Sequence, residues 1–323
     1  MLYPLTFLPI FKERVWGGRN LEQLYGKSLP AGKVIGESWE ITDRSGDTSV
    51  VANGPLAGRT LRWLMENHAT ELLGSARAAQ GQFPLLVKLL DAQDKLSLQV
   101  HPPASQAAAL GGEPKTELWY IAAATPGAEL YVGLNRGVTR PEFEQRIQDG
   151  AVAGCFHRVP VRAGDAMFLP SGRVHAIGAG LVIFEIQQNS DTTYRVFDWN
   201  RVGLDGKARE LHIAESLASI DFNDFEPALV TGAFAGDEAL KRRWLVRDSL
   251  FSVEELRLAA GAVTPLPPGA MQIIACLTGT LNVDGDGLSV KLAAGHFSLV
   301  AASLDKVRLR ASTPASVLCV AAG

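Results

Sequence analysis

One stretch of this sequence decides the fold: Gly164-Asp-Ala-Met-Phe-Leu-Pro170-Ser-Gly172-Arg-Val-His175. A glycine precedes a strand-like run at 166–169, and Pro170 and Gly172 predict a tight turn after it. The turn places His175 at the start of the next strand, so we expect the imidazole to point into the mouth of a β-barrel. A lone histidine is more often a core residue whose hydrogen bonds are made within the protein. The complete pattern of glycine, proline and histidine at this spacing is a far more specific signal than the histidine alone.

Around this stretch the chain is predicted to be mainly β with a few short helices. The 323 residues include 32 glycines and 17 prolines, a density of turn residues that favours many short strands. Predicted strands cover 83–90, 96–100, 118–122, 129–132, 166–169, 181–186, 252–258, 272–277, 279–283 and 307–310. Predicted helices cover 61–73, capped by Thr60, 141–148, capped by Thr139, and 211–220. Strands from end to end indicate sandwiches or barrels, and the length suggests two domains.

Composition and charge exclude several classes of protein. The net charge is −3, whereas a nucleic-acid binder usually has a basic surplus. No stretch is apolar enough for a membrane helix, and the first residues lack the basic region of a signal peptide. Cys155, Cys276 and Cys319 are odd in number and widely spaced, which favours reduced thiols and a cytoplasmic location.

Two further segments carry groups that could meet His175. Residues two apart in a strand point to the same face, so Ser97, Gln99 and His101 share one face of 96–101. Taken alone, this could equally be a solvated edge. Lys115 and Glu117 also share a face, and taken alone they would more often form a surface ion pair.

Together these segments supply an amide oxygen, two imidazoles and one carboxylate. Such nitrogen and oxygen ligands suit a divalent metal, and an imidazole-rich set favours zinc over magnesium or calcium. Because no cysteine takes part, a catalytic site with an open coordination position fits better than a structural clamp.

The segment from Glu185 to Arg201 is dense in polar and charged residues without a helical period. Its position next to the metal strand predicts a rim that faces the substrate. The alternative is a charged loop held by salt bridges, in which Arg195 would pair with Asp191 or Asp198.

Six motifs in order resemble one known family, the type I mannose-6-phosphate isomerases, in their short bacterial form. These zinc enzymes belong to the cupin superfamily, and the motifs span roughly residues 1–215. The motifs are Gly36-Glu-Ser-Trp-Glu40, Leu89-Leu-Asp-Ala, Gln99-Val-His-Pro, Lys115-Thr-Glu117, the turn that ends at His175, and Gln187-Gln-Asn-Ser-Asp-x-x-Tyr-Arg195.

The resemblance implies a fold of two cupin-type β-sandwich or jelly-roll units and a role for each candidate residue. One Zn²⁺ per chain is implied, with the ligands Gln99, His101, Glu117 and His175. The implied catalytic arginine is Arg195, and the groups that move protons or contact the sugar are Lys115, Glu185 and Asp191. Lys88 and Ser97 match positions that hold the phosphorylated substrate.

The organisation expected along the chain is a catalytic metal-binding unit at 1–220, a connection at 221–245 and a degenerate cupin-like unit at 246–323. Counted from Gly295, the slots of proline, glycine and histidine hold Ala301, Ser303 and Lys306. An ammonium group has no lone pair for a metal. We therefore expect the second unit to bind no metal and to serve packing or dimer contacts, in a monomer or a homodimer.

The activity implied is zinc-dependent interconversion of mannose 6-phosphate and fructose 6-phosphate through a cis-enediol. Either Lys115 or Glu185 could carry the proton, although a lysine base needs a lowered pKa, for which the metal and Arg195 are candidate causes. Glu117 and His175 lie too close in sequence for the helical insertion of long family members. The resemblance therefore assigns no phosphate contact that this insertion would supply. Two rival functions are a metal-dependent cupin dioxygenase and a non-catalytic sugar-phosphate sensor, because a fold does not fix a function.

Overall fold

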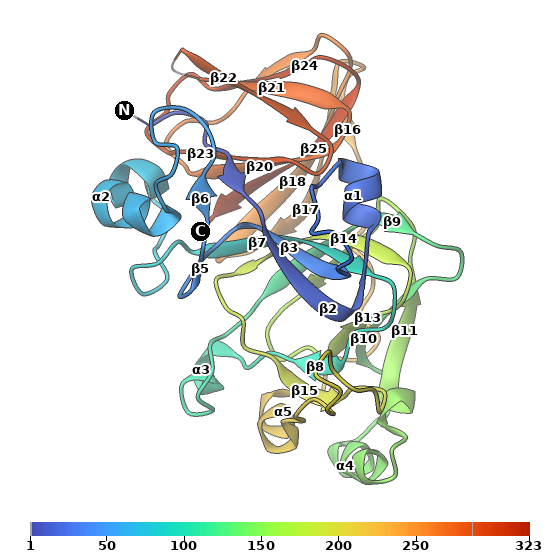
Figure 1. Ribbon diagram of the computed structural model, residues 1–323. Coiled ribbons are helices and arrows are strands. Elements are labelled where there is room, and N and C mark those ends of the chain that lie inside the picture. Colours follow the sequence, from blue (N-terminus) through green and yellow to red (C-terminus); the bar gives the residue numbers. More distant parts are fainter. Residues whose placement is uncertain (1, 286) are drawn as a thin grey trace.

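The computed structural model describes residues 2–285 and 287–323, whose strands form two stacked β-sandwich units (Figure 1). In the first unit a six-stranded sheet faces a five-stranded sheet, and every pairing is antiparallel. The larger sheet has the order β12 (Ala166–Leu169), β9 (Glu117–Ala124), β14 (Leu181–Gln188), β7 (Leu85–Ala92), β3 (Ile35–Ile41) and β2 (Ile10–Gly18). The smaller sheet has the order β11 (Phe156–Pro160), β10 (Glu129–Leu134), β13 (His175–Ile177), β8 (Leu98–Val100) and β15 (Tyr194–Phe197).

The second unit repeats this plan with a six-stranded and a four-stranded sheet. The larger sheet has the order β16 (Ala235–Gly236), β17 (Leu240–Arg247), β18 (Phe251–Leu258), β25 (Ala315–Ala322), β20 (Gln272–Thr278) and β23 (Phe297–Val300). The smaller sheet has the order β19 (Val263–Pro265), β24 (Arg308–Ala311), β21 (Thr280–Gly285) and β22 (Leu288–Ala293). Two short pairs join β1 (Phe7–Leu8) to β6 (Val50–Val51) and β4 (Asp43–Arg44) to β5 (Asp47–Thr48). The predicted mainly-β fold is confirmed.

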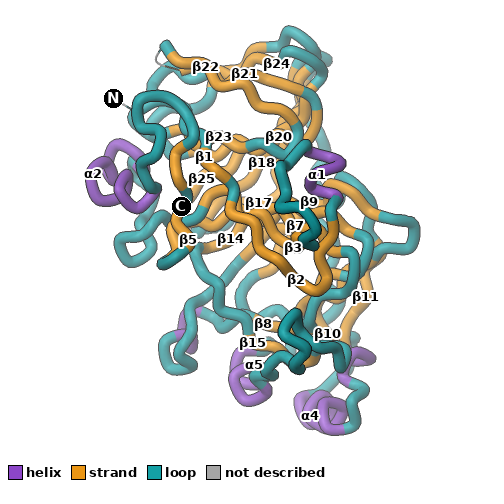
Figure 2. Tube along the Cα trace, in the orientation of Figure 1, coloured by secondary structure: helices purple, strands orange, loops and turns teal. Residues whose placement is uncertain are grey.

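The helices lie at the outside of the sheets (Figure 2). The three predicted ones are present as α2 (Leu61–Leu73), α4 (Arg140–Gln148) and α5 (Ile213–Ser219). Thr60 and Thr139 accept hydrogen bonds from backbone amides in the first turns of α2 and α4, as expected of N-caps. The sequence did not predict α1 (Asn20–Tyr25), α3 (Ala104–Ala107) or the 3₁₀ turn η1 (Val152–Cys155). In the described part of the chain, no helix combines the length and the apolar character needed to cross a membrane.

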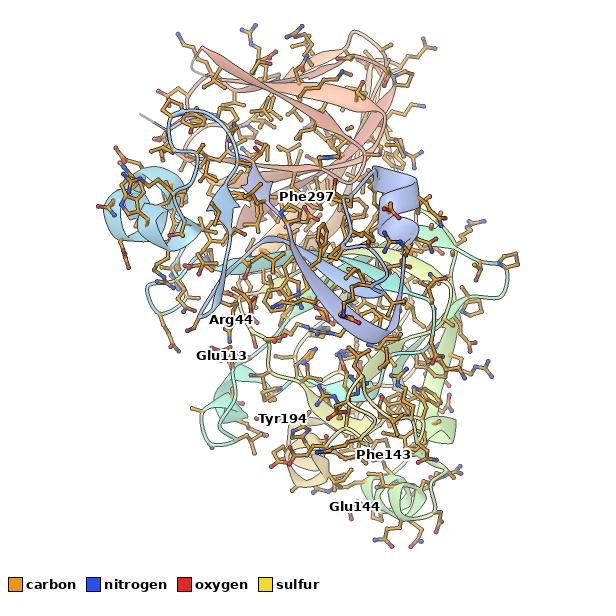
Figure 3. The ribbon with its side chains drawn as sticks, in the orientation of Figure 1. Arg44, Glu113, Phe143, Glu144, Tyr194 and Phe297 are labelled. Atoms are coloured by element: carbon orange, nitrogen blue, oxygen red, sulfur yellow. The ribbon has the colours of Figure 1, made fainter. Side chains whose placement is uncertain are left out.

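One hydrophobic core joins the two units. Every residue of β7 is buried, because one face of its sheet lines the first sandwich while the other packs on the second unit. Phe184 in β14 and Phe297 in β23 meet across this junction, with ring centroids 5.6 Å apart; Figure 3 labels Phe297. The buried ion pair of Arg243 with Glu255 also reaches across, because Arg243 donates a hydrogen bond of 2.6 Å to the carbonyl oxygen of Gly164. The second unit therefore supports the turn that leads to His175.

The predicted connection at 221–245 differs from the structure in its second half. There β16 and the start of β17 already belong to the larger sheet of the second unit. β17 carries Lys241, Arg242 and Arg243 and leaves four of its eight residues exposed, so its composition resembles that of a loop.

Candidate active site

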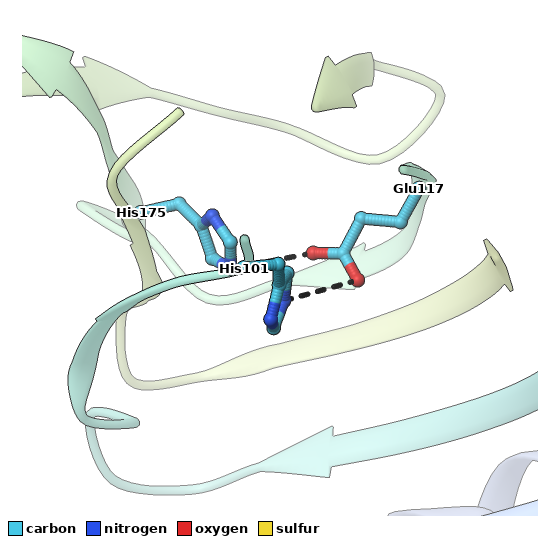
Figure 4. Close-up of side chains that lie close together, drawn as sticks. All are labelled: His101, Glu117 and His175. Carbon is cyan, nitrogen blue, oxygen red and sulfur yellow. Dashed lines mark ion pairs between the residues drawn. The ribbon is translucent and has the colours of Figure 1, made fainter. Parts of the chain in front are cut away.

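His101, Glu117 and His175 converge inside the first sandwich (Figure 4). Glu117 is the first residue of β9, His175 is the first residue of β13, and His101 directly follows β8. Their candidate ligand atoms all lie within 4.8 Å of one another, and all three side chains are buried. The two oxygens of Glu117 each face one imidazole, at 3.4 Å from Nε2 of His175 and 3.7 Å from Nε2 of His101.

The turn before His175 has the predicted form. The backbone amide of Arg173 donates to the carbonyl oxygen of Pro170, and Gly172 adopts a φ of 94°, which favours glycine. The amide of Gly172 also donates to the carbonyl oxygen of His101 at 2.8 Å. One turn therefore fixes the backbones of both histidines.

Both imidazoles are held in the form that binds a metal. Nδ1 of His101 lies 2.8 Å from the carbonyl oxygen of Thr192, and Nδ1 of His175 lies 2.9 Å from that of Arg173. Because a carbonyl only accepts, each Nδ1 donates and each Nε2 keeps its lone pair. Burial, together with the Lys115 ammonium, lowers the pKa of His101 to about 4, and burial also lowers the pKa of His175. Because both pKa values are lowered, both imidazole rings are neutral at physiological pH.

Buried polar atoms without partners test whether the site fits a metal. Within the described residues, Nε2 of His101 and Oε1 of Glu117 have no hydrogen-bond partner, and such atoms are costly unless something binds them. Gln99 pairs with His175 across β8 and β13, and its amide lies 3.3 Å from Nε2 of His175. Because the two ends of an amide are interchangeable by a flip, the Gln99 oxygen can face the same point. The donor set fits a divalent cation.

Beside the trio, buried charges alternate in a chain. Lys115 lies 2.7 Å from Oε2 of Glu117 and 3.8 Å from Oε1 of Glu185, which in turn lies 3.4 Å from Lys88. Lys88 reaches Glu37 at 3.7 Å. Lys115 and Glu117, which taken alone would more often form a surface pair, are both buried.

Burial and the neighbouring carboxylates set the ionisation of Lys115. Burial would lower the pKa of Lys115, but the Glu117 carboxylate outweighs burial and raises it. Conversely, burial would raise the pKa of Glu117, but Lys115 holds it well below its usual range. Beside the Glu117 carboxylate, Lys115 is therefore held as an ammonium group.

Arg195 lies beside Gln99, its partner across β15 and β8. Among the described residues the guanidinium has no carboxylate within ion-pair distance, and its Nε has no hydrogen-bond partner. The alternative of a pair with Asp198 is not observed, because Asp198 binds Arg201 at 2.8 Å and Arg209 at 2.6 Å instead.

A cavity of about 480 Å³ opens beside the trio. Seven predicted site residues line the cavity: Lys88, Ser97, Gln99, Lys115, Glu185, Asp191 and Arg195. The buried trio lies behind them. Sequence reasoning assigned no role to several other lining residues, chiefly Arg14 and Glu37 on β2 and β3 and Arg209 after β15. Glu37 lies inside a motif already noted, which was the available signal for it.

Arg14 reaches the cavity because β2 lies very close to β3. A Cβ atom on Gly36 would lie 2.6 Å from Cβ of Arg14 and equally close to the ring of Trp16, so only glycine allows this approach. Nε of Arg14 donates to Oε1 of Glu37 at 2.7 Å, and Trp39 donates to the other oxygen of Glu37 at 2.6 Å.

Comparison with known proteins identifies the family. Residues 5–118 match the model of a family described as phosphomannose isomerase type I, catalytic domain. The mannose-6-phosphate isomerase of Streptococcus mutans serotype c is 36% identical over 280 residues, which are 86% of this chain and 86% of that protein. This chain belongs to the type I phosphomannose isomerase family.

Other relatives of the type I phosphomannose isomerase family agree. Mannose-6-phosphate isomerase ManA of Bacillus subtilis is 40% identical over 264 residues, 80% of this chain and 81% of that protein. A crystal structure of the mannose 6-phosphate isomerase from Bacillus subtilis superposes with a TM-score of 0.90 at 29% identity, covering 99% of each chain. The resemblance predicted from the six motifs is confirmed, and with it the isomerase class of the enzyme.

Proposed function

We propose that this enzyme interconverts mannose 6-phosphate and fructose 6-phosphate through a cis-enediol at a Zn²⁺ site. The observation that carries the proposal is the buried trio, in which both imidazoles turn Nε2 toward the Glu117 carboxylate, next to a cavity lined by proton-carrying groups. Gln99, His101, Glu117 and His175 would hold the ion. A bound Zn²⁺ polarises a substrate oxygen and lowers the cost of negative charge on it.

The geometry favours Glu185 as the group that takes the proton from carbon. Trp119 donates to its Oε2 at 3.0 Å, while Oε1 has no hydrogen-bond partner among the described residues. A carboxylate so fixed can accept a proton at one atom and return it to the neighbouring carbon. Lys115, as an ammonium group 3.8 Å from that oxygen, can donate a proton or a hydrogen bond to the substrate oxygens.

Arg195 would stabilise the enediolate. Its fork of donors pairs with no carboxylate of the described residues and lies beside Gln99, so it can meet the charge that develops on the substrate. Lys88, Ser97 and Asp191 line the same cavity and would contact the phosphorylated sugar. The Ser97 hydroxyl lies 3.1 Å from the other end of the Gln99 amide, so it would accept a hydrogen bond from the amide nitrogen when the oxygen faces the ion.

A coupled isomerase assay on the purified chain, with metal analysis of the same sample, tests the proposal. We expect turnover of mannose 6-phosphate, about one zinc per chain, loss of turnover with a chelator, and recovery on adding Zn²⁺. Substrate binding without turnover would identify a sensor. Oxygen uptake with an iron-loaded site would identify a dioxygenase.

A further inference from the structure

Two arginines that the motif analysis did not single out lie at the mouth of the cavity. Arg14 projects from β2, and Arg209 follows β15 in the chain. Their side chains are 34% and 25% exposed, whereas those of Lys88 and Lys115 are only 5% and 6% exposed. The lysines therefore lie at the closed end of the cavity and the arginines at its open end.

Each arginine is held by a carboxylate that leaves part of its fork free. Arg209 donates from Nε and Nη2 to Asp198, at 2.7 and 2.6 Å. Arg14 donates from Nε to Glu37 and from Nη1 to the carbonyl oxygen of Glu13. Within the described residues, Nη1 of Arg209 and Nη2 of Arg14 have no such partner.

The backbone keeps Arg209 next to Arg195. The amide of His212 donates to the carbonyl oxygen of Arg195 at 2.8 Å, and the amide of Arg195 lies 3.4 Å from Nδ1 of His212. These contacts close the loop between the two residues. Asp198, buried and fixed by Arg201 as well, anchors the loop from within.

Three guanidinium groups thus gather around one cavity. Burial lowers the pKa of Arg195, and the positive charges of Arg209 and Arg14 lower it further, while the carboxylates of Asp198 and Asp191 partly oppose them. Two of the carboxylates at this rim are already engaged, since Glu13 lies 3.0 Å from Lys33 and Asp205 accepts from the amide of Lys207. A dianion placed between the arginines would relieve their mutual repulsion, and guanidinium forks match the oxygens of a phosphate.

We infer that Arg14 and Arg209 form the clamp for the 6-phosphate of the substrate. The inference rests on the proposed function and assigns the phosphate end of that same site. Neighbouring strands lie about 4.8 Å apart, so the strand order from His175 through Gln99 to Arg195 leads away from the metal ligands toward the clamp. The reacting carbons lie at one end of the sugar and would then meet the metal end of the cavity. The phosphate lies at the other end and would meet the clamp. Arg195, between them, is left for the enediolate.

The test measures binding and turnover separately. The binding probe is sorbitol 6-phosphate, which has no carbonyl group and cannot isomerise, followed by calorimetry with zinc-loaded protein. The variants are Arg14→Gln, Arg209→Gln and Arg209→Lys. The control is Arg310→Gln, because Arg310 pairs with Asp284 in the second unit and does not line the cavity.

Each Gln variant should weaken sorbitol 6-phosphate binding by roughly 10- to 100-fold, as expected for one lost charge-assisted hydrogen bond. KM for mannose 6-phosphate should rise in parallel while kcat changes little. Arg209→Lys should lose less, and Arg310→Gln should lose nothing.

Unchanged affinity in both Gln variants would overturn the clamp, and so would a fall in kcat at unchanged KM. Both variants could also lose zinc or melt at a lower temperature while their folded fraction still binds sorbitol 6-phosphate with unchanged affinity. That result would assign the two arginines a structural role and would also overturn the clamp. A wild-type chain that binds sorbitol 6-phosphate but does not isomerise mannose 6-phosphate would defeat the proposed function and leave the clamp standing.

Discussion

The turn that ends at His175 and the turn that ends at Lys306 occupy equivalent places in the two units, yet they deliver different chemistry. Gly164 and Gly295 begin them, each with a positive φ, of 92° and 76°. His175 is 1% exposed and faces Glu117, whereas Lys306 is exposed. The two turns begin in the same way, and the residue that ends each turn decides which side chain is presented there.

The strands beside each turn differ in the same direction. Strands β8 and β9 place polar side chains inside the first sandwich, whereas the smaller sheet of the second unit fills its core with Leu281, Val283 and Leu309, which are fully buried. The smaller sheet of the first unit also has a fifth strand, β15, which carries Arg195. A metal site therefore needs the turn, its partner strands and a cavity together.

Replacing the residue at the exit of each turn gives the largest contrast. His175→Ala should remove most of the bound metal and lower activity by at least about 10³-fold, because Lewis-acid assistance is worth several kcal/mol. Lys306→Ala should leave the metal content and the turnover unchanged. Metal analysis and the isomerase assay check both, and a ratio near two metals per chain would break the comparison.

The support that the second unit gives to the first predicts the next effect. Arg243→Met leaves the fully buried Glu255 without its 2.6 Å partner and removes the hydrogen bond to Gly164. Glu255 keeps Arg257 at 3.2 Å and the Ser316 hydroxyl at 3.1 Å, so its charge stays partly compensated. The free energy of unfolding should therefore fall by about 1.5–3 kcal/mol in a denaturant titration, as for a lost hydrogen bond to a charged group.

The matched control for Arg243→Met is Arg310→Met, since Arg310 pairs with Asp284 on the surface of the same unit. It should cost far less, because exposed ion pairs contribute little. Equal losses in the two variants would show that the junction does not depend on Arg243.

The strand that only the first unit has predicts an effect on turnover. Arg195→Lys keeps the charge but loses the fork, so kcat should fall by roughly 10²- to 10³-fold, as for one lost oxyanion donor. Zinc content and melting temperature should barely change. A rise in KM at constant kcat would instead give Arg195 a phosphate-binding role, and lost stability with normal specific activity would give it a structural one.

Much of the metal centre was predictable because local rules fix it. The turn residues and the alternation along a strand predicted that Ser97, Gln99 and His175 turn toward one interior; in the structure Ser97 and Gln99 line the cavity and Gln99 lies opposite His175. Helix ends at Thr60 and Thr139 followed from capping alone. In each case the deciding neighbours lie within a few residues in the sequence.

The other wall of the site depends on contacts between distant segments. Strand β2 pairs irregularly with β3, so its sequence lacks the alternation of polar and apolar residues that predicts a strand. Arg14 reaches the cavity only because Gly36 lets the two backbones approach. Arg209 depends on a loop closed by His212 and Asp198. β17 was placed partly in a connection because its charges hide a strand, whereas β25, an apolar run, carried a signal that was overlooked.

The smallest expected effect concerns Gln99, the one amide side chain proposed as a ligand. His101 and Glu117 contribute a neutral and a negative donor, and the amide keeps the site positive toward an anionic intermediate. Gln99→Glu should retain zinc but add a negative charge, which weakens Lewis acidity and slows turnover by about tenfold, a barrier change of about 1.4 kcal/mol. Gln99→Leu removes the donor and should release zinc at chelator concentrations that the wild-type chain withstands. A leucine variant with full zinc occupancy and activity would leave the trio as the whole ligand set, and the contrast with the second unit would then rest on three side chains.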